Sequence, residues 1–174
     1  MSQDDDSEPA PVVTVTSTSP DEASPLSTTT NLPAAVWPPR VLGDLMTRRL
    51  ITVAEGEPIG ELEESMQRFA FHHLPVVDGA MRLVGLISRT DYLHARLGAA
   101  PDGKPVPPLG ATTPASAIMR RNVVFGHMGD SLRMACDVML KEKLSCLPVV
   151  LDDRTLVGIV TTTDVLRLAH ELLS

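Results

Sequence analysis

The sequence has few aromatic residues and few cysteines. Phe, Trp and Tyr make up 3% of its 174 residues, whereas 43% are hydrophobic, so aliphatic side chains and methionine must fill the core. The two cysteines, Cys136 and Cys146, show no CxxC spacing and lie in apolar segments. We interpret them as buried thiols of a reducing compartment rather than as a metal or redox pair.

Membrane spans, a basic leader and a basic surface are also missing. No stretch reaches the roughly 18 consecutive apolar residues of a membrane helix, and the chain starts MSQDDDSE, unlike the basic start of a signal peptide. The net charge is −7, and most of it comes from acidic residues among the first 40. The nearly balanced charge of the remaining residues argues against nucleic-acid binding. We therefore expect a cytoplasmic protein without membrane or nucleic-acid partners.

The sequence also lacks common catalytic motifs. It contains no GxSxG, no P-loop and no HExxH, which indicates that the protein is not an enzyme. His72 and His73 are adjacent, so on a strand they would face opposite sides, and no further ligands stand at usable spacing. We expect no metal site.

What the sequence does have is an internal repeat. LPVV at Leu74 returns at Leu147, and LVG at Leu83 returns at Leu156, without a gap between the two registers. Between Leu45–Leu93 and Ile118–Leu166, 14 of 49 positions are identical. Two copies are too few for a solenoid, so we expect them to pack on each other as one pseudo-symmetric module with a ligand cleft between them.

The repeat divides the chain into four parts. Residues 1–40 are rich in Ser, Thr, Pro and acidic residues and are expected to be a disordered tail. Residues 41–97 form the first copy, residues 98–113 a Pro/Gly-rich linker, and residues 114–174 the second copy.

Each copy reads β-α-β-β-α. The β-branched runs Leu50–Val53 and Val123–Phe125 predict a first strand, and apolar residues at helical spacing predict a helix after each. LPVV and LVGLI or LVGIV predict the next two strands, separated by a turn. Helices are predicted over residues 90–97 and 163–172, capped by Thr90 and Thr163. Methionines at equivalent positions of the copies are expected to be packing residues: Met46, Met66, Met119 and Met139.

The segments GLISRTD (Gly85 to Asp91) and GIVTTTD (Gly158 to Asp164), each preceded by LPVV and a short turn, resemble the CBS domain, named for cystathionine β-synthase. The resemblance covers both copies. It implies an α/β (α+β) fold of tandem β-α-β-β-α CBS repeats packed about a pseudo-two-fold axis, called a Bateman module. It also implies a regulatory module that binds an adenosine-containing ligand in the cleft, and a homodimer.

The residues at the end of each copy suit such a ligand. Helix N-termini carry spare N–H donors and partial positive charge, which favour a phosphate, and the carboxylates of Asp91 and Asp164 can accept hydrogen bonds from a ribose diol. The candidate residues at these turns are Ser88, Arg89, Thr90, Asp91, Thr161, Thr162, Thr163 and Asp164. A plainer interpretation is that these Thr and Asp residues only cap helices.

Two further assignments complete the candidate site. The resemblance implies that adenine lies against the opposite half, near these residues: Ile51, Val53, His73, Pro75, Val124, Cys146 and Pro148. Arg89 corresponds to the neutral Thr162, so we expect any polyphosphate preference to belong to the site of Asp91.

The expected ligand is AMP, ADP or ATP, with S-adenosylmethionine as a further possibility. Two other hypotheses stay open: a constitutive interaction or dimerisation scaffold without a small-molecule ligand, and a magnesium or other ion sensor acting through a bound nucleotide. Asp91→Ala and Asp164→Ala are each expected to weaken nucleoside binding by about 1.5–3 kcal/mol, the worth of a hydrogen bond to a charged group.

Overall fold

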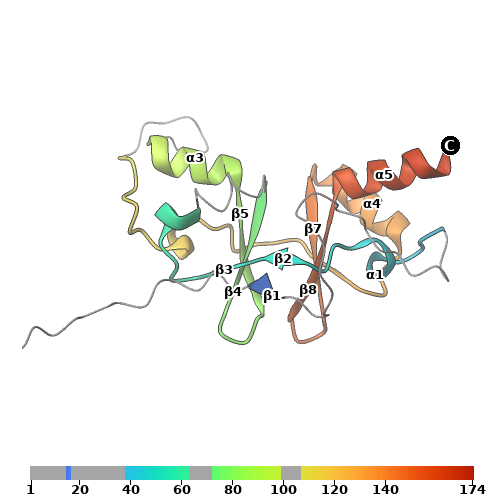
Figure 1. Ribbon diagram of the computed structural model, residues 1–174, viewed down its shortest axis with the longest axis horizontal. Helices are drawn as coiled ribbons and strands as arrows, with labels where there is room; N and C mark the ends of the chain where they lie inside the picture. Colours follow the sequence, from blue (N-terminus) through green and yellow to red (C-terminus); the bar gives the residue numbers. More distant parts are fainter. Residues whose placement is uncertain (1–14, 17–37, 63–71, 99–106) are drawn as a thin grey trace, which may run out of the picture.

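The computed structural model describes residues 15–16, 38–62, 72–98 and 107–174, and they form two halves that stand side by side (Figure 1). The first half contains a sheet of β3 (Val53–Ala54), β4 (His73–Val77) and β5 (Leu83–Ser88). The second contains a sheet of β6 (Gly126–His127), β7 (Cys146–Val150) and β8 (Leu156–Thr161). In both sheets the central strand is parallel to the first and antiparallel to the third. The predicted mixed fold of two repeated units is confirmed.

The pattern of burial explains why the two LPVV segments are central strands. All five residues of β7 are buried, whereas β5 and β8 alternate between buried and half-buried residues. A central strand is therefore covered on both faces and the third strand mainly on one. The register also repeats, since Pro75 pairs with Leu86 and Pro148 with Ile159.

Helices follow the third strand of each sheet. These are α3 (Arg89–Leu97) and α5 (Thr162–Leu172), and both begin at the same end of the two sheets and run outward in opposite directions (Figure 1). Helix α4 (Leu132–Lys141) precedes β7. Its counterpart is helical over 59–62, and the rest of that predicted helix, including Met66, lies outside the described residues.

The first segment of each copy packs into the other half. Helix α1 (Leu42–Leu45) and Met46 lie in the core of the second half, beside β8 (Figure 1). The 3₁₀ turn η1 (Ala115–Ala117) and Met119 lie in the core of the first. Met46, Met119 and Met139 are buried, so these methionines are packing residues as predicted.

Two glycines make this exchange possible. A Cβ added to Gly85 would clash with Met119, reaching its Cγ at 2.8 Å, and a Cβ added to Gly158 would meet Met46 in the same way. The glycine of each LVG segment therefore leaves room for the methionine of the other copy.

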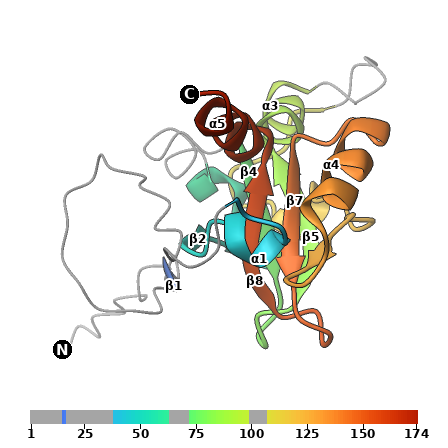
Figure 2. The ribbon, with the colours of Figure 1, turned by 90° about the vertical axis from the view of Figure 1, so that its right-hand side faces the viewer.

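The halves are also joined where their hairpin turns meet, which Figure 2 shows at one end of the sheets. The N–H of Leu83 donates to Arg154 O at 2.9 Å, and the N–H of Leu156 donates to Met81 O at 3.0 Å. An apolar cluster lies between the hairpins and is made of Val77, Leu83, Val150 and Leu156. The two copies form one pseudo-symmetric module.

The first strands differ from their prediction. Leu50–Val53 divides into β2 (Leu50–Ile51), which pairs with β1 (Val15–Thr16), and β3, which begins at Val53. In the second copy the strand lies at β6, after the predicted Val123–Phe125. Val123 and Phe125 lie outside the paired strand and pack against the apolar cluster between the hairpins.

The predicted tail and much of the predicted linker fall outside the described residues. From the tail, Val15–Thr16 forms β1 and residues 38–40 precede α1. The described end of the linker is attached to the first half, since Ile59 N–H donates to Thr113 O and Gly60 N–H to Ala111 O, both at 2.8 Å. No helix within the described ranges is long and apolar enough to cross a bilayer.

The two cysteines have different environments. Cys146 is buried in β7, and burial raises the pKa of its thiol to about 12. Cys136 is half-buried on α4, and its pKa is also raised, first by burial and then by the charge of Asp137. The prediction of buried thiols is met fully by Cys146 and partly by Cys136.

Candidate functional site

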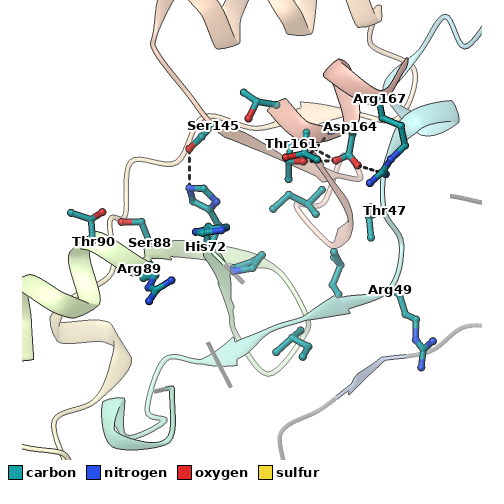
Figure 3. Close-up of a pocket in the computed structure, with 17 residues that line it drawn as sticks. Thr47, Arg49, His72, Ser88, Arg89, Thr90, Ser145, Thr161, Asp164 and Arg167 are labelled. Atoms are coloured by element: carbon teal, nitrogen blue, oxygen red, sulfur yellow. Dashed lines mark hydrogen bonds and ion pairs between the residues drawn. The ribbon is translucent and has the colours of Figure 1, made fainter. Parts of the chain in front are cut away.

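A cavity of about 550 Å³ lies between the two halves, at the ends of the strands where α3 and α5 begin (Figure 3). The first half contributes β2 and the loop before it, the start of β4 and the start of α3. The second half contributes the end of β8 and the first turn of α5. The lining residues used below are Thr47, Arg49, Ile51, His72, His73, Pro75, Ser88, Arg89, Thr90, Ser145, Ile159, Thr161, Thr162, Thr163, Asp164 and Arg167.

Asp164 lies in this cavity as the third residue of α5. Its Oδ2 accepts hydrogen bonds from the N–H of Thr161 at 2.8 Å and from the Thr161 hydroxyl at 2.7 Å. The N–H of Asp164 donates in return to Thr161 Oγ1 at 3.3 Å, which completes a capping box. The Asp164 side chain is 10% exposed, and its other carboxylate oxygen, Oδ1, lies 3.6 Å from Arg167 Nη1. One carboxylate oxygen thus holds the helix start, and the second is not used by the cap.

Asp91 holds the start of α3 in the same way. Its Oδ2 accepts from the N–H of Ser88 at 3.1 Å and from the Ser88 hydroxyl at 2.6 Å, and its own N–H donates to Ser88 Oγ at 3.1 Å. The predicted caps Thr90 and Thr163 are therefore wrong: the caps are Ser88 and Thr161, each two residues earlier. Because the Ser88 and Thr161 hydroxyls are engaged in caps, the threonine hydroxyls at the cavity that remain for an anion belong to Thr47, Thr90, Thr162 and Thr163.

Asp91 differs from Asp164 in having an arginine on its carboxylate. Arg120 Nη2 donates to Oδ1 at 2.7 Å, and Arg120 Nε donates to Oδ1 at 3.1 Å and to Oδ2 at 3.2 Å. Burial raises the pKa of Asp91, but the hydrogen bonds from Arg120 and Ser88 outweigh it and hold this pKa below its usual range. The same contact raises the pKa of Arg120. Both carboxylate oxygens of Asp91 are engaged, and Asp91 is not among the residues that line the cavity.

The cavity is rich in cationic side chains. Arg49, Arg89 and Arg167 line it together with a single carboxylate, that of Asp164. We expected Arg89 to serve the site of Asp91, but it lines the cavity that contains Asp164. Arginine binds phosphate oxygens with several N–H donors, so this cavity suits a ligand that carries negative charge.

His73 connects the halves across the cavity. Its Nε2 lies 3.0 Å from the hydroxyl of Ser145, and this hydrogen bond is drawn in Figure 3. Burial, followed by the charge of His72, lowers the pKa of His73, while Asp91 opposes the shift. The neutral imidazole is therefore favoured at the point where the two halves meet.

The structure brings together most of the candidate residues chosen from the sequence. Those that line the cavity are Ile51, His73, Pro75, Ser88, Arg89, Thr90, Thr161, Thr162, Thr163 and Asp164. Five candidates are not among its lining residues: Asp91, Val53, Val124, Cys146 and Pro148. Val53, Cys146 and Pro148 are buried in the sheets, and Val124 is 42% exposed.

Sequence reasoning did not find Thr47, Arg49 or Arg167. A comparison of the two copies points to the two arginines, since Arg49 corresponds to Asn122 and Arg167 to His94. The repeat therefore does not supply equivalent arginines for the site of Asp91.

The model of the CBS domain family matches residues 42–98 and again residues 115–171. The chain belongs to the CBS domain family. These two matches cover nearly all of the two halves described above, so the resemblance seen in the sequence is confirmed.

Curated relatives show the same region inside longer proteins. An uncharacterized protein of Methanocaldococcus jannaschii is 31% identical over 137 residues, which cover 73% of this chain and 46% of that protein. A homoserine O-acetyltransferase of Methanohalobium evestigatum is 29% identical over 130 residues, 75% of this chain and 24% of the enzyme. The chain thus spans less than half the length of these relatives.

Three solved structures share the fold and contain adenosine compounds. The CBS domain pair of protein MJ0100, in complex with 5′-methylthioadenosine and S-adenosyl-L-methionine, matches with a TM-score of 0.64 and 29% identity over 76% of this chain and 97% of that one. CBSX2 in complex with AMP matches with a TM-score of 0.65 and 26% identity over 77% of this chain and 98% of that one. The cytosolic domain of the Mg²⁺ channel MgtE in complex with ATP matches with a TM-score of 0.61 and 28% identity over 74% of this chain and 48% of that one.

Proposed function

We propose that the protein is a cytoplasmic regulatory module that binds an adenosine nucleotide in the cavity between its CBS domains and signals the binding to a partner. The observation that carries the proposal is the Asp164 carboxylate, with one oxygen outside the capping box, in a cavity that also holds three arginines. The cavity volume, about 550 Å³, lies within the usual range for small-molecule sites.

We propose a position for each part of the nucleotide from the chemistry of the lining. The ribose hydroxyls donate to Asp164 Oδ1. The phosphates lie toward Arg89 and the hydroxyls of Thr162 and Thr163, at the N-termini of α3 and α5. The adenine lies on the apolar side, against Ile51 and Pro75.

Charge selects among adenosine ligands. ATP and ADP carry more negative charge than AMP, and S-adenosylmethionine carries a sulfonium cation in place of phosphate. Three arginines against one carboxylate therefore favour ATP or ADP over AMP, and all of them over S-adenosylmethionine. The structural relatives with ATP, AMP and S-adenosyl-L-methionine support adenosine compounds as the ligand class.

Binding of each ligand is tested by calorimetry, with and without Mg²⁺, on the natural chain and on Asp164→Asn. The substitution keeps the shape of the side chain and removes its charge. Losing a hydrogen bond to a charged group costs about 1.5–3 kcal/mol, so affinity is expected to fall by at least about tenfold. Asp137→Asn, at an exposed position on α4, is the matched control and is expected to bind like the natural chain. Equal affinity in Asp164→Asn, or no binding of any of the four ligands, contradicts the proposal.

A second candidate function is a constitutive interaction scaffold, including a homodimer without a small-molecule ligand. It is favoured by large apolar side chains exposed on α4, in the middle of α5 and just after α5, since exposed apolar surface that gathers in one place marks interaction sites. These are Met134 at 66%, Leu140 at 79%, Leu166 at 69% and Leu173 at 88% exposure. Sedimentation measures the dimer, and a dimer that forms without any nucleotide response in the calorimetry supports the scaffold.

A further inference from the structure

The two ends of the cleft are equivalent in backbone structure. Thr47 and Ile159 exchange two hydrogen bonds, at 2.9 and 3.0 Å, beside the start of α5. Arg120 and Leu86 exchange the same two, at 2.9 and 3.0 Å, beside the start of α3. Thr47 and Arg120 are also equivalent positions of the repeat. The side chain at this one position therefore stands next to the capping aspartate of the other half.

The two ends differ in what that side chain does. Thr47 lines the cavity with Asp164 (Figure 3). Within the described residues, the Asp164 side chain pairs with Thr161 and Arg167, and its Oδ1 has a single contact, of 3.6 Å, with Arg167. Arg120 is long enough to place its guanidinium on Asp91, with three donor contacts of 2.7 to 3.2 Å to the two carboxylate oxygens.

We propose that Arg120 closes the site of Asp91, so that each chain binds one nucleotide, at Asp164, and that the residue at position 47 or 120 decides which aspartate accepts the ligand. This inference rests on the proposed nucleotide function. Arg120 acts as an internal ligand that occupies the oxygens a ribose diol would need.

The physical basis is a competition for one carboxylate. Asp91 is 8% exposed at its side chain and is paired with a full positive charge through a bidentate contact. A ribose diol offers two neutral hydroxyl donors, so exchanging Arg120 for the diol replaces charge-assisted hydrogen bonds by weaker ones. Asp164 has no such partner to displace, since Arg167 approaches only one oxygen, at 3.6 Å.

The second copy also shows that the fold accepts an uncharged residue here. Asp164 keeps a capping box of the same geometry as that of Asp91 with threonine at position 47. Arg120 is 66% exposed at its side chain, so replacing it with threonine removes no core packing. Arg120→Thr gives the site of Asp91 the threonine that the site of Asp164 already has. Thr47→Arg gives the site of Asp164 the arginine that closes the site of Asp91.

The test is the number of ATP molecules bound per chain, measured by calorimetry and by equilibrium dialysis with AMP as a second probe. The natural chain is expected to bind one ATP, and Arg120→Thr two. Adding Asp91→Asn to Arg120→Thr is expected to return the number to one. Thr47→Arg is expected to weaken the natural site by at least about tenfold. Thermal melting of every variant without ligand verifies folding.

The outcomes separate this inference from the function on which it rests. If the natural chain and Arg120→Thr both bind no nucleotide, the proposed function fails. If the natural chain binds two, or if folded Arg120→Thr still binds one, nucleotide binding stands and the role of Arg120 is overturned. Should Arg120→Thr misfold, Thr47→Arg decides alone, because unchanged binding in that variant contradicts control by this position.

Discussion

The ion pair between Asp91 and Arg120 predicts a measurable coupling energy. The perturbation is a double-mutant cycle with Asp91→Asn, Arg120→Gln and the double variant, which keep side-chain size while removing charge. Exposed ion pairs contribute about 0.2–1 kcal/mol, whereas breaking a buried pair costs about 3–5 kcal/mol. Here the side-chain exposures are 8% and 66%, so the pair is half-buried and is screened by solvent on the Arg120 side. We expect a coupling of about 1–2 kcal/mol.

The assay is urea unfolding at pH 7 and at lower pH. The pKa of Asp91 is lowered in the folded state, so its stabilising contribution is present above its unfolded pKa, about 3.9, and is lost as the pH falls through the folded value. The coupling is therefore expected at pH 7 and should decline below about pH 4. A coupling near zero at pH 7, or one that grows on acidification, would refute the view that Arg120 is held on Asp91.

Further predictions concern packing, pH and thiol reactivity. Gly85→Ala is expected to cost about 1–3 kcal/mol in urea unfolding because its Cβ would overlap Met119, whereas Gly79→Ala, with nothing within 4 Å of its Cβ, should change stability by no more than about 0.5 kcal/mol. Burial lowers the pKa of His73, so its contribution to the free energy of unfolding is complete above about pH 6.5 and is lost below it. The stability advantage of the natural chain over His73→Gln should therefore shrink as the pH falls from about 7.5 to about 5.5. An advantage that grows over this range contradicts the expected sign. Cys146, with a pKa of about 12, should resist a thiol reagent in the native protein and react fully in urea, and rapid native labelling would contradict its burial.

Much of the fold could be predicted because the same strand and turn patterns occur in both copies of the repeat. The β4 and β7 strands fall on the LPVV segments, and their register repeats between the copies. The weakest prediction was the first strand of the second copy, because Gly126 and His127 have little strand preference and pair with β7 only through the tertiary structure. Local sequence therefore favoured the β-branched Val123 and its neighbours instead.

Most residues of the site could be predicted from the sequence, but the difference between the surroundings of Asp91 and Asp164 could not. The capping box that joins Thr161 to Asp164 has a visible S/T-x-x-D signature, and the structure shows that capping and cavity lining are both roles of Asp164. The contact between Arg120 and Asp91 spans 29 residues and depends on the exchange of segments between the halves. Its signal in the sequence was the replacement of Thr47 by Arg120 in an otherwise matched register.

The most direct test of the account is a crystal structure of the protein with ATP. We predict one nucleotide per chain, with its ribose hydroxyls within hydrogen-bond distance of Asp164 Oδ1, its phosphates beside Arg89, and Arg120 still on Asp91. A nucleotide whose ribose lies on Asp91, or one bound outside the cavity between the two CBS domains, would contradict it.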